Sequence, residues 1–238
     1  MLVTVIGRGH SGTRAVSETL SRSGFYMGEP LNASWDLIPP EKMYDACRVF
    51  ARYVDYKGGL EWDFNRVISM QPDKEFTVLI EEYLHSVLSS DAPDKGWKIP
   101  ETTLCYPWII KMFPDAHYIH WVRDPRDCIL SGHVTDDLSD FGIEYPHTDD
   151  IRKMRAVSWK YQRELMLATP EPAHIIKLRF EDMVLNQDKT LERLSDYLGK
   201  PMAKIAVKPE AVGRYKTAQG QYMFDFFKQD MLECGYCD

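Results

Sequence analysis

A glycine-rich turn near the start of the chain carries the residues best suited to bind an anion. The apolar run 2–6 leads into Gly-Arg-Gly-His-Ser-Gly-Thr-Arg at 7–14, and an amphipathic segment follows. A strand, a glycine-rich turn and a helix N-terminus together direct backbone N–H groups at a phosphate. The candidate binding residues in this turn are Arg8, Gly9, His10, Ser11, Gly12, Thr13 and Arg14.

The turn departs from the phosphate loop of nucleoside triphosphatases directly after Gly12. Those enzymes need a Lys there to reach the β- and γ-phosphates, followed by a Ser or Thr that holds Mg²⁺. This chain has Thr13 and Arg14 at the two places. The sequence therefore predicts a phosphate-binding loop that requires no metal.

A second candidate anion site follows the apolar run 117–122. Arg123 comes directly after this run, and Ser131 follows eight residues later. Ligands of open parallel sheets bind at the carboxyl ends of strands, where a guanidinium and a hydroxyl can grip one phosphate from two sides. An isolated Arg at a strand end is more often part of a structural ion pair, so the prediction depends on its combination with the glycine-rich turn.

The elements that must position these residues alternate along the chain. Apolar runs followed by helical periodicity indicate an α/β fold, here a P-loop-type three-layer sandwich with a central, mostly parallel sheet of about five strands flanked by helices. One domain over 1–238 accommodates the whole pattern. The expected strands are 2–7, 25–28, 95–99, 117–122 and 174–179, and the expected helices are 73–89, 150–167, 188–198 and 220–233.

Two stretches are expected to be irregular. Glycines and a proline interrupt 55–72, and acidic residues crowd around Gly142 in 135–148. Long loops of this kind serve as lids or binding loops, or form a solvated acidic surface; both interpretations stay open for 135–148.

Composition excludes several classes of partner. The chain of 238 residues has a net charge of −7, which argues against nucleic acid and other polyanions and favours a small-molecule or peptide partner. Five cysteines and the absence of a long apolar run predict a cytoplasmic protein that does not enter a membrane. Cys234 and Cys237 have redox-motif spacing but no second pair to complete a zinc site, so no metal is expected.

In their order along the chain, these motifs resemble those of the PAPS-dependent sulfotransferases, which transfer a sulfuryl group from 3′-phosphoadenosine 5′-phosphosulfate to a hydroxyl or amine. The Ser-Gly-Thr at 11–13 is similar to the end of the loop that binds the 5′-phosphosulfate in that family. Arg123 and Ser131 are spaced like the family's pair for the 3′-phosphate. The resemblance implies PAPS as donor and PAP as product.

Two weaker similarities lie further along the chain. The segment 180–184, Phe-Glu-Asp-Met-Val, is similar to the family's Tyr-Glu-Asp-Leu segment. The segment 213–216 lies near the place of a basic cofactor-binding loop. This similarity adds Arg214 and Lys216 to the cofactor-binding candidates.

The resemblance also implies catalytic roles. Lys98 in Lys-Ile-Pro is similar to the catalytic Lys segment of tyrosylprotein sulfotransferases, where the Lys stabilises the transferring sulfonate. His10 stands where the family commonly has Lys or Arg. An imidazolium could supply the same charge, or His10 could donate a hydrogen bond as a partly charged acid while Arg8 or Arg14 carries the permanent charge.

A general base must accept the proton of the attacking hydroxyl. Many cytosolic sulfotransferases use a His two residues after the Lys, but this chain has Pro100 there. Glu29 falls near the base of tyrosylprotein sulfotransferases and is the first candidate, followed by Glu101 and then Asp36.

The sequence therefore predicts an enzyme that moves a sulfuryl group from PAPS to the hydroxyl of a small molecule or peptide by in-line displacement, without a metal. Two alternatives stay open. One is a P-loop kinase that uses ATP and Mg²⁺, which shares the strand, loop and helix at the start of the fold. The other is a non-catalytic nucleotide-binding module, favoured by His10 and by the missing His base.

Overall fold

Four parallel strands form the central sheet of the computed structural model, which describes residues 1–217, 220 and 222–236. Their order across the sheet is β4-β1-β5-β6, so the first strand lies inside it. The strands are β1 (Leu2–Ile6), β4 (Lys95–Lys98), β5 (His117–Val122) and β6 (Ile175–Arg179). The sequence is apolar on both faces of the inner strands, as parallel sheets covered by helices require. The predicted α/β architecture is confirmed.

The fifth predicted strand, 25–28, makes only one bridge to the sheet. Tyr26 pairs with Lys95 in parallel at the edge beyond β4. Its carbonyl accepts a hydrogen bond from the Gly96 N–H at 2.8 Å. Gly28 then takes a left-handed conformation and turns the chain away from the sheet.

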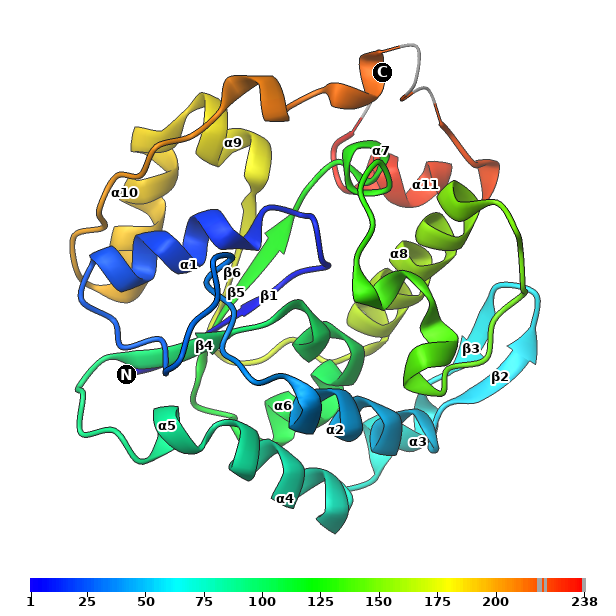
Figure 1. Ribbon diagram of the computed structural model, residues 1–238, viewed down its shortest axis with the longest axis horizontal. Coiled ribbons are helices and arrows are strands. Elements are labelled where there is room, and N and C mark those ends of the chain that lie inside the picture. Colours follow the sequence, from blue (N-terminus) through cyan, green and yellow to red (C-terminus); the bar gives the residue numbers. More distant parts are fainter. Residues whose placement is uncertain (218–219, 221, 237–238) are drawn as a thin grey trace.

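Helices cover both faces of the sheet, and Figure 1 shows α1, α9 and α10 on the opposite side of the strands from α2, α4 and α6. Val3 and Val5 pack with α1 and α10 on the first face, and Trp97 and Tyr118 pack with α2 and α4 on the second. The helices are α1 (Thr13–Arg22), α2 (Glu41–Ala51), α3 (Asn65–Ser69), α4 (Lys74–Tyr83), α5 (His85–Leu88), α6 (Tyr106–Met112), α7 (Pro125–Cys128), α8 (Ile151–Ala168), α9 (Phe180–Leu185), α10 (Gln187–Leu198) and α11 (Asp225–Glu233).

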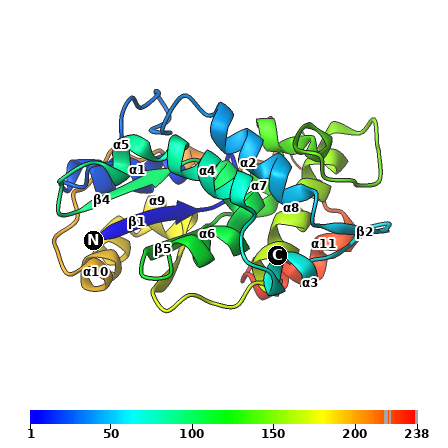
Figure 2. The ribbon, with the colours of Figure 1, turned by 90° about the horizontal axis from the view of Figure 1, so that it is seen from below.

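The stretch 55–72 was expected to be irregular, and this expectation is wrong. It forms an antiparallel hairpin, β2 (Asp55–Gly58) and β3 (Glu61–Asp63), followed by α3. Figures 1 and 2 both show this hairpin at one end of the molecule. Two adjacent glycines, which suggested a loop, make its turn, because both have positive φ.

Other boundaries differ by smaller amounts. The single helix expected over 73–89 is broken at Leu84 into α4 and α5, and the last helix begins only at Asp225. The stretch 135–148 contains two short 3-10 turns, Val134–Asp136 and Leu138–Phe141. Within the described ranges, none of the helices combines the length and the apolar character needed to cross a bilayer.

Candidate active site

The turn after β1 is shaped around the N-terminus of α1. Residues 7–12 join the two elements, and Gly12 has a φ of 86° at the N-cap. A Cβ on Gly12 would lie 2.3 Å from the Phe180 ring, and a Cβ on Gly9 would lie 2.1 Å from the His133 ring. Neither position can therefore accept a side chain. Since no side chain caps α1, its N-terminus can receive an anion.

Arg8 points into the protein rather than toward this N-terminus. It is 5% exposed, and its guanidinium forms an ion pair with Asp136 and donates a hydrogen bond to the Gly9 carbonyl. The Asp136 carboxylate also accepts a hydrogen bond from Arg155 Nε at 3.0 Å. In the ligand-free protein, Arg8 therefore stabilises the loop through contacts on its buried side.

The remaining loop residues divide by exposure. Ser11 and Thr13 are buried, and the Ser11 hydroxyl donates to the Arg8 carbonyl. Arg14 is exposed on the first turn of α1. Its positive charge is one of the causes that lower the pKa of Lys98, which places these two cations near each other.

Lys98 ends β4, next to the end of β1. Its side chain is 2% exposed, and its ammonium donates to the Ser34 carbonyl at 2.7 Å and pairs with Asp36. The other Asp36 oxygen accepts from the Asn32 amide at 3.0 Å. Burial lowers the pKa of Lys98, and Asp36 opposes that shift. A buried ammonium is thus held beside the glycine-rich turn by the loop that follows α1.

Glu101 lies in the 3-10 turn Pro100–Cys105, directly after β4. It is 1% exposed, and burial raises its pKa to about 7. Within the described residues, its Oε2 has no hydrogen-bond partner. An unpaired buried carboxyl group is costly, and such groups gather where chemistry needs them.

His133 faces Glu101 with a defined tautomer. Its Nδ1 accepts a hydrogen bond from the Thr135 N–H at 3.2 Å, so the ring proton sits on Nε2. That nitrogen lies 3.9 Å from Glu101 Oε1. Burial lowers the pKa of His133 to about 3, so the ring stays neutral and presents an N–H toward the carboxylate.

His10 lies above His133, with the ring centroids 5.6 Å apart in an edge-to-face arrangement. It is exposed and has a left-handed backbone with a φ of 59°. Burial of part of the ring, with Arg8 as a smaller contribution, lowers the pKa of His10 below 6.5. In the ligand-free protein the imidazole is therefore mostly neutral at pH 7, and the permanent positive charge comes from Lys98 and Arg14.

Glu29, the first candidate base, lies at the edge of the sheet. It is exposed, and its backbone N–H donates to Ser86 Oγ at 3.2 Å. Burial raises the pKa of Tyr26, and the Glu29 carboxylate adds to that shift. Among the described residues, the hydrogen-bond and ion-pair partners of Lys98 are Ser34 and Asp36, and Glu29 is not one of them. The carboxylates that act on the Lys98 ammonium are those of Asp36 and Glu101.

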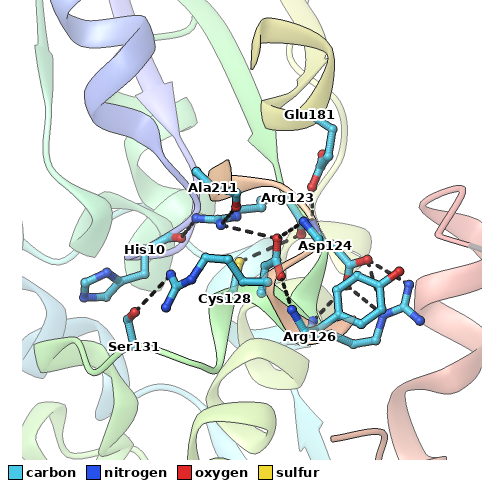
Figure 3. A network of polar contacts seen from close by, with 12 residues as sticks. His10, Arg123, Asp124, Arg126, Cys128, Ser131, Glu181 and Ala211 are labelled. Carbon is cyan, nitrogen blue, oxygen red and sulfur yellow. Dashed lines mark hydrogen bonds and ion pairs between the residues drawn. The ribbon is translucent and has the colours of Figure 1, made fainter. Parts of the chain in front are cut away.

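Arg123 links the glycine-rich turn to the C-terminal part of the chain, as Figure 3 shows. Its Nη1 donates to the His10 carbonyl at 3.0 Å, and its Nη2 donates to the Ala211 carbonyl. Its guanidinium also stacks on the Phe180 ring, 4.3 Å from the centroid. The Arg therefore lies at the carboxyl end of β5 beside the loop after β1, as its position after the strand predicted.

Ser131 meets the basic segment 213–216. The Arg214 guanidinium lies 3.5 Å from Ser131 Oγ, and Lys216 is exposed in the same 3-10 turn, Arg214–Lys216. The structure thus brings Ser131 and Arg214 together although 83 residues separate them. Asp127, which the sequence did not single out, holds this segment through the backbone N–H groups of Gly213 and Tyr215.

The family follows from a direct comparison with known proteins. A family model described as the sulfotransferase family matches residues 3–204. The chain belongs to the sulfotransferase family. No curated protein sequence matches it significantly.

Solved structures support the fold of this sulfotransferase. It is similar to the sulfotransferase domain from the curacin biosynthetic pathway, with 14% identity and a TM-score of 0.61 over 99% of this chain and 97% of that one. It is also similar to the sulfotransferase domain from the olefin synthase of Synechococcus PCC 7002, with 15% identity and a TM-score of 0.60 over 100% of this chain and 95% of that one. The motif resemblance found in the sequence therefore named the right family.

Proposed function

We propose that this sulfotransferase takes its sulfuryl group from PAPS and transfers it to a hydroxyl of a small molecule or peptide. The observation that carries the proposal is that two groups of residues suited to bind anions lie at the carboxyl ends of neighbouring strands. One is the uncapped N-terminus of α1 after β1, and the other is the group of Arg123, Ser131 and Arg214 after β5. A donor with a 5′-phosphosulfate and a 3′-phosphate has one anion for each.

The residues present fit this donor. The glycine-rich turn would hold the 5′ end through backbone N–H groups, and Arg123, Ser131, Arg214 and Lys216 would hold the 3′ end. The buried Nε of Arg123 has no hydrogen-bond partner among the described residues, as expected of a group that awaits a ligand. Thr13 and Arg14 supply no metal ligands of the nucleoside triphosphatase kind, so the proposed reaction needs no Mg²⁺.

Lys98 and Arg14 would supply the positive charge that this reaction requires. When bound, PAPS supplies the sulfuryl group and leaves as PAP. In an in-line transfer, negative charge would grow on the bridging oxygen as its bond to sulfur breaks and the bond from the acceptor oxygen forms, so a nearby cation would be needed. Lys98 can face that oxygen by giving up the Ser34 carbonyl, while Asp36 keeps it oriented.

A carboxylate near Lys98 would accept the proton of the attacking hydroxyl. Among the three acidic candidates, Glu101 fits best, because burial raises its pKa to about 7 and a base works best near the operating pH. Asp36 is already paired with Lys98 and Asn32, and Glu29 is directed toward Tyr26. His133 would keep the Glu101 carboxylate in place.

Ligand-induced stabilisation tests the donor. A ligand that binds only the folded state of a protein raises the melting temperature of that protein. We expect PAP to raise the melting temperature, and ATP with Mg²⁺ to raise it much less. The opposite result would contradict PAPS as donor and favour the kinase alternative. Release of radiolabelled sulfate from PAPS, or its transfer to an added acceptor, would distinguish an enzyme from a non-catalytic nucleotide-binding module.

A further inference from the structure

A small pocket lies beside Ser131 on the surface that faces the segment 213–216. Its volume is about 280 Å³, and it is lined by Leu130, Arg152, Arg214 and Thr217. Arg214 is the residue that contacts Ser131, so the pocket adjoins the proposed 3′-phosphate site. Arg152 comes from the first turn of α8 and was not a candidate on sequence grounds.

The two arginines that line this pocket have no acidic partner in the described part of the chain. Within residues 1–217, 220 and 222–236, neither Arg152 nor Arg214 forms an ion pair with a carboxylate. Arg152 Nη1 is buried and makes no hydrogen bond there. Two guanidinium groups that line one pocket repel each other, and a buried N–H without a partner is costly. An anion between them would offset both costs.

The position of Arg152 is fixed by its surroundings. The Asp150 side chain caps α8 by accepting the backbone N–H groups of Arg152 and Lys153 at 2.9 and 3.1 Å, so this carboxylate serves the backbone. The Arg152 guanidinium lies over the Tyr222 ring, 5.0 Å from its centroid. The ring contacts the guanidinium on one side, and Nη1 stays without a hydrogen-bond partner among the described residues, in a side chain that lines the pocket.

We propose that Arg152 is a further ligand of the donor's 3′-phosphate and faces Arg214 across this pocket. This inference rests on the proposed function, since it takes the 3′-phosphate of PAPS as the anion that the pocket receives. A planar guanidinium binds two phosphate oxygens at once, so Arg152 adds both charge and orientation to the contacts of Arg123 and Ser131. The phosphate would then be enclosed by Arg123 and Ser131 from the chain after β5, Arg214 from the 3-10 turn Arg214–Lys216, and Arg152 from the first turn of α8.

Calorimetric titration with PAP and with AMP isolates the contribution of the 3′-phosphate, because AMP lacks it. For Arg152→Gln we expect PAP affinity to fall by about tenfold or more, because the charge-assisted hydrogen bonds to the 3′-phosphate are lost and such bonds are stronger than neutral hydrogen bonds. AMP affinity should stay unchanged. Arg152→Lys keeps the positive charge but cannot bind two phosphate oxygens at once, so PAP affinity should fall less than in Arg152→Gln. Lys153→Gln, at the exposed neighbouring position on the same turn, is the matched control and should bind both ligands as the wild type does.

Each other outcome decides the question. If Arg152→Gln binds PAP as tightly as the wild type, or loses PAP and AMP affinity equally, the assignment is overturned while PAPS remains the donor. If wild-type protein binds PAP no more tightly than AMP, the donor proposal fails and the assignment fails with it. Melting temperatures of the three variants within about 3 °C of the wild type confirm that they are folded.

Discussion

The Asp127 carboxylate accepts a hydrogen bond from the backbone N–H of Tyr215 at 2.9 Å, across 88 residues of chain. Its second oxygen accepts from the Gly213 N–H at 2.9 Å and pairs with Arg123. The side chain is fully buried. One carboxylate therefore fixes the distance between Arg123, which follows β5, and the segment that carries Arg214.

Replacement of Asp127 by Asn should weaken PAP binding through this connection. An amide presents N–H groups to one of the two backbone donors, so one charge-assisted hydrogen bond is lost and the segment 213–216 shifts. We expect PAP affinity to fall about tenfold with AMP affinity unchanged, measured by titration calorimetry. Combined with Arg214→Ala, the Asn variant should add little, because both changes remove the same contact to the phosphate. Additive losses would show that Asp127 acts by another route.

Replacement of Lys98 by Met should lower kcat far more than it changes the KM for PAPS. The ammonium is needed when charge develops in the transition state, and loss of one such group costs about 10²–10³-fold in rate. Lys95→Met is the matched control: it starts the same strand, and its ammonium donates to the Leu88 and Ser90 carbonyls. Equal activity losses in the two variants would assign the effect to the strand rather than to Lys98.

Replacement of Glu101 by Gln should change how stability depends on pH. Burial raises the pKa of Glu101 from 4.5 in the unfolded chain to about 7 in the folded one, so the folded state favours the protonated form. The stabilisation that Glu101 contributes to the folded state is therefore fully present below pH 4.5 and is lost as the pH rises to 7. The Gln variant lacks this loss and should gain stability relative to the wild type by an amount on the order of 3 kcal/mol between pH 4 and pH 8. Urea unfolding at both pH values measures the difference, and a constant difference would contradict a raised pKa.

The same variant tests the proton transfer. If Glu101 is the base, wild-type kcat rises as the carboxyl ionises, with an apparent pKa near 7, and Glu101→Gln loses both the rate and this limb of the profile. Glu29→Gln should leave the profile unchanged. A profile that changes only in the Glu29 variant would restore Glu29 as the base.

Removal of the Arg8 guanidinium should destabilise the fold. Arg8→Ala leaves the buried Asp136 paired with Arg155 but not with Arg8, and breaking a buried pair costs about 3–5 kcal/mol. The comparison is Arg22→Ala, which removes an ion pair between the exposed Arg22 and the half-buried Glu18 at the surface of α1 and should cost about 1 kcal/mol or less. Chemical denaturation of both variants gives the two values. If Arg8→Ala kept its stability but lost PAP binding, the result would indicate that Arg8 binds the donor rather than stabilising the loop.

The sequence predicted those parts of the site that depend on local pattern. The glycine-rich turn and Arg123 each directly follow an apolar run, and the end of a strand fixes where the next residue lies. Lys98 is the last residue of β4 and became a candidate through the family resemblance. Contacts between residues far apart in the chain left no local sequence pattern from which they could be predicted. Nothing near Arg8 indicated that Asp136 would pair with it, and nothing near Asp127 indicated hydrogen bonds to Gly213 and Tyr215. The hairpin over 55–63 was missed because adjacent glycines are typical both of loops and of tight turns.

The place of β1 inside the sheet also affects how the chain must fold. Val3 pairs with Gly96 on one side and with His117 on the other, so β1 gains its second neighbour only when about half of the chain has been made. Parallel strands cannot pair locally, and closing such long loops costs entropy before any contact stabilises them. During synthesis the apolar first strand therefore has no strand to pair with until residues 95–122 have been made. Fragments that end before β5 should consequently expose β1 and aggregate, whatever their intrinsic helix content.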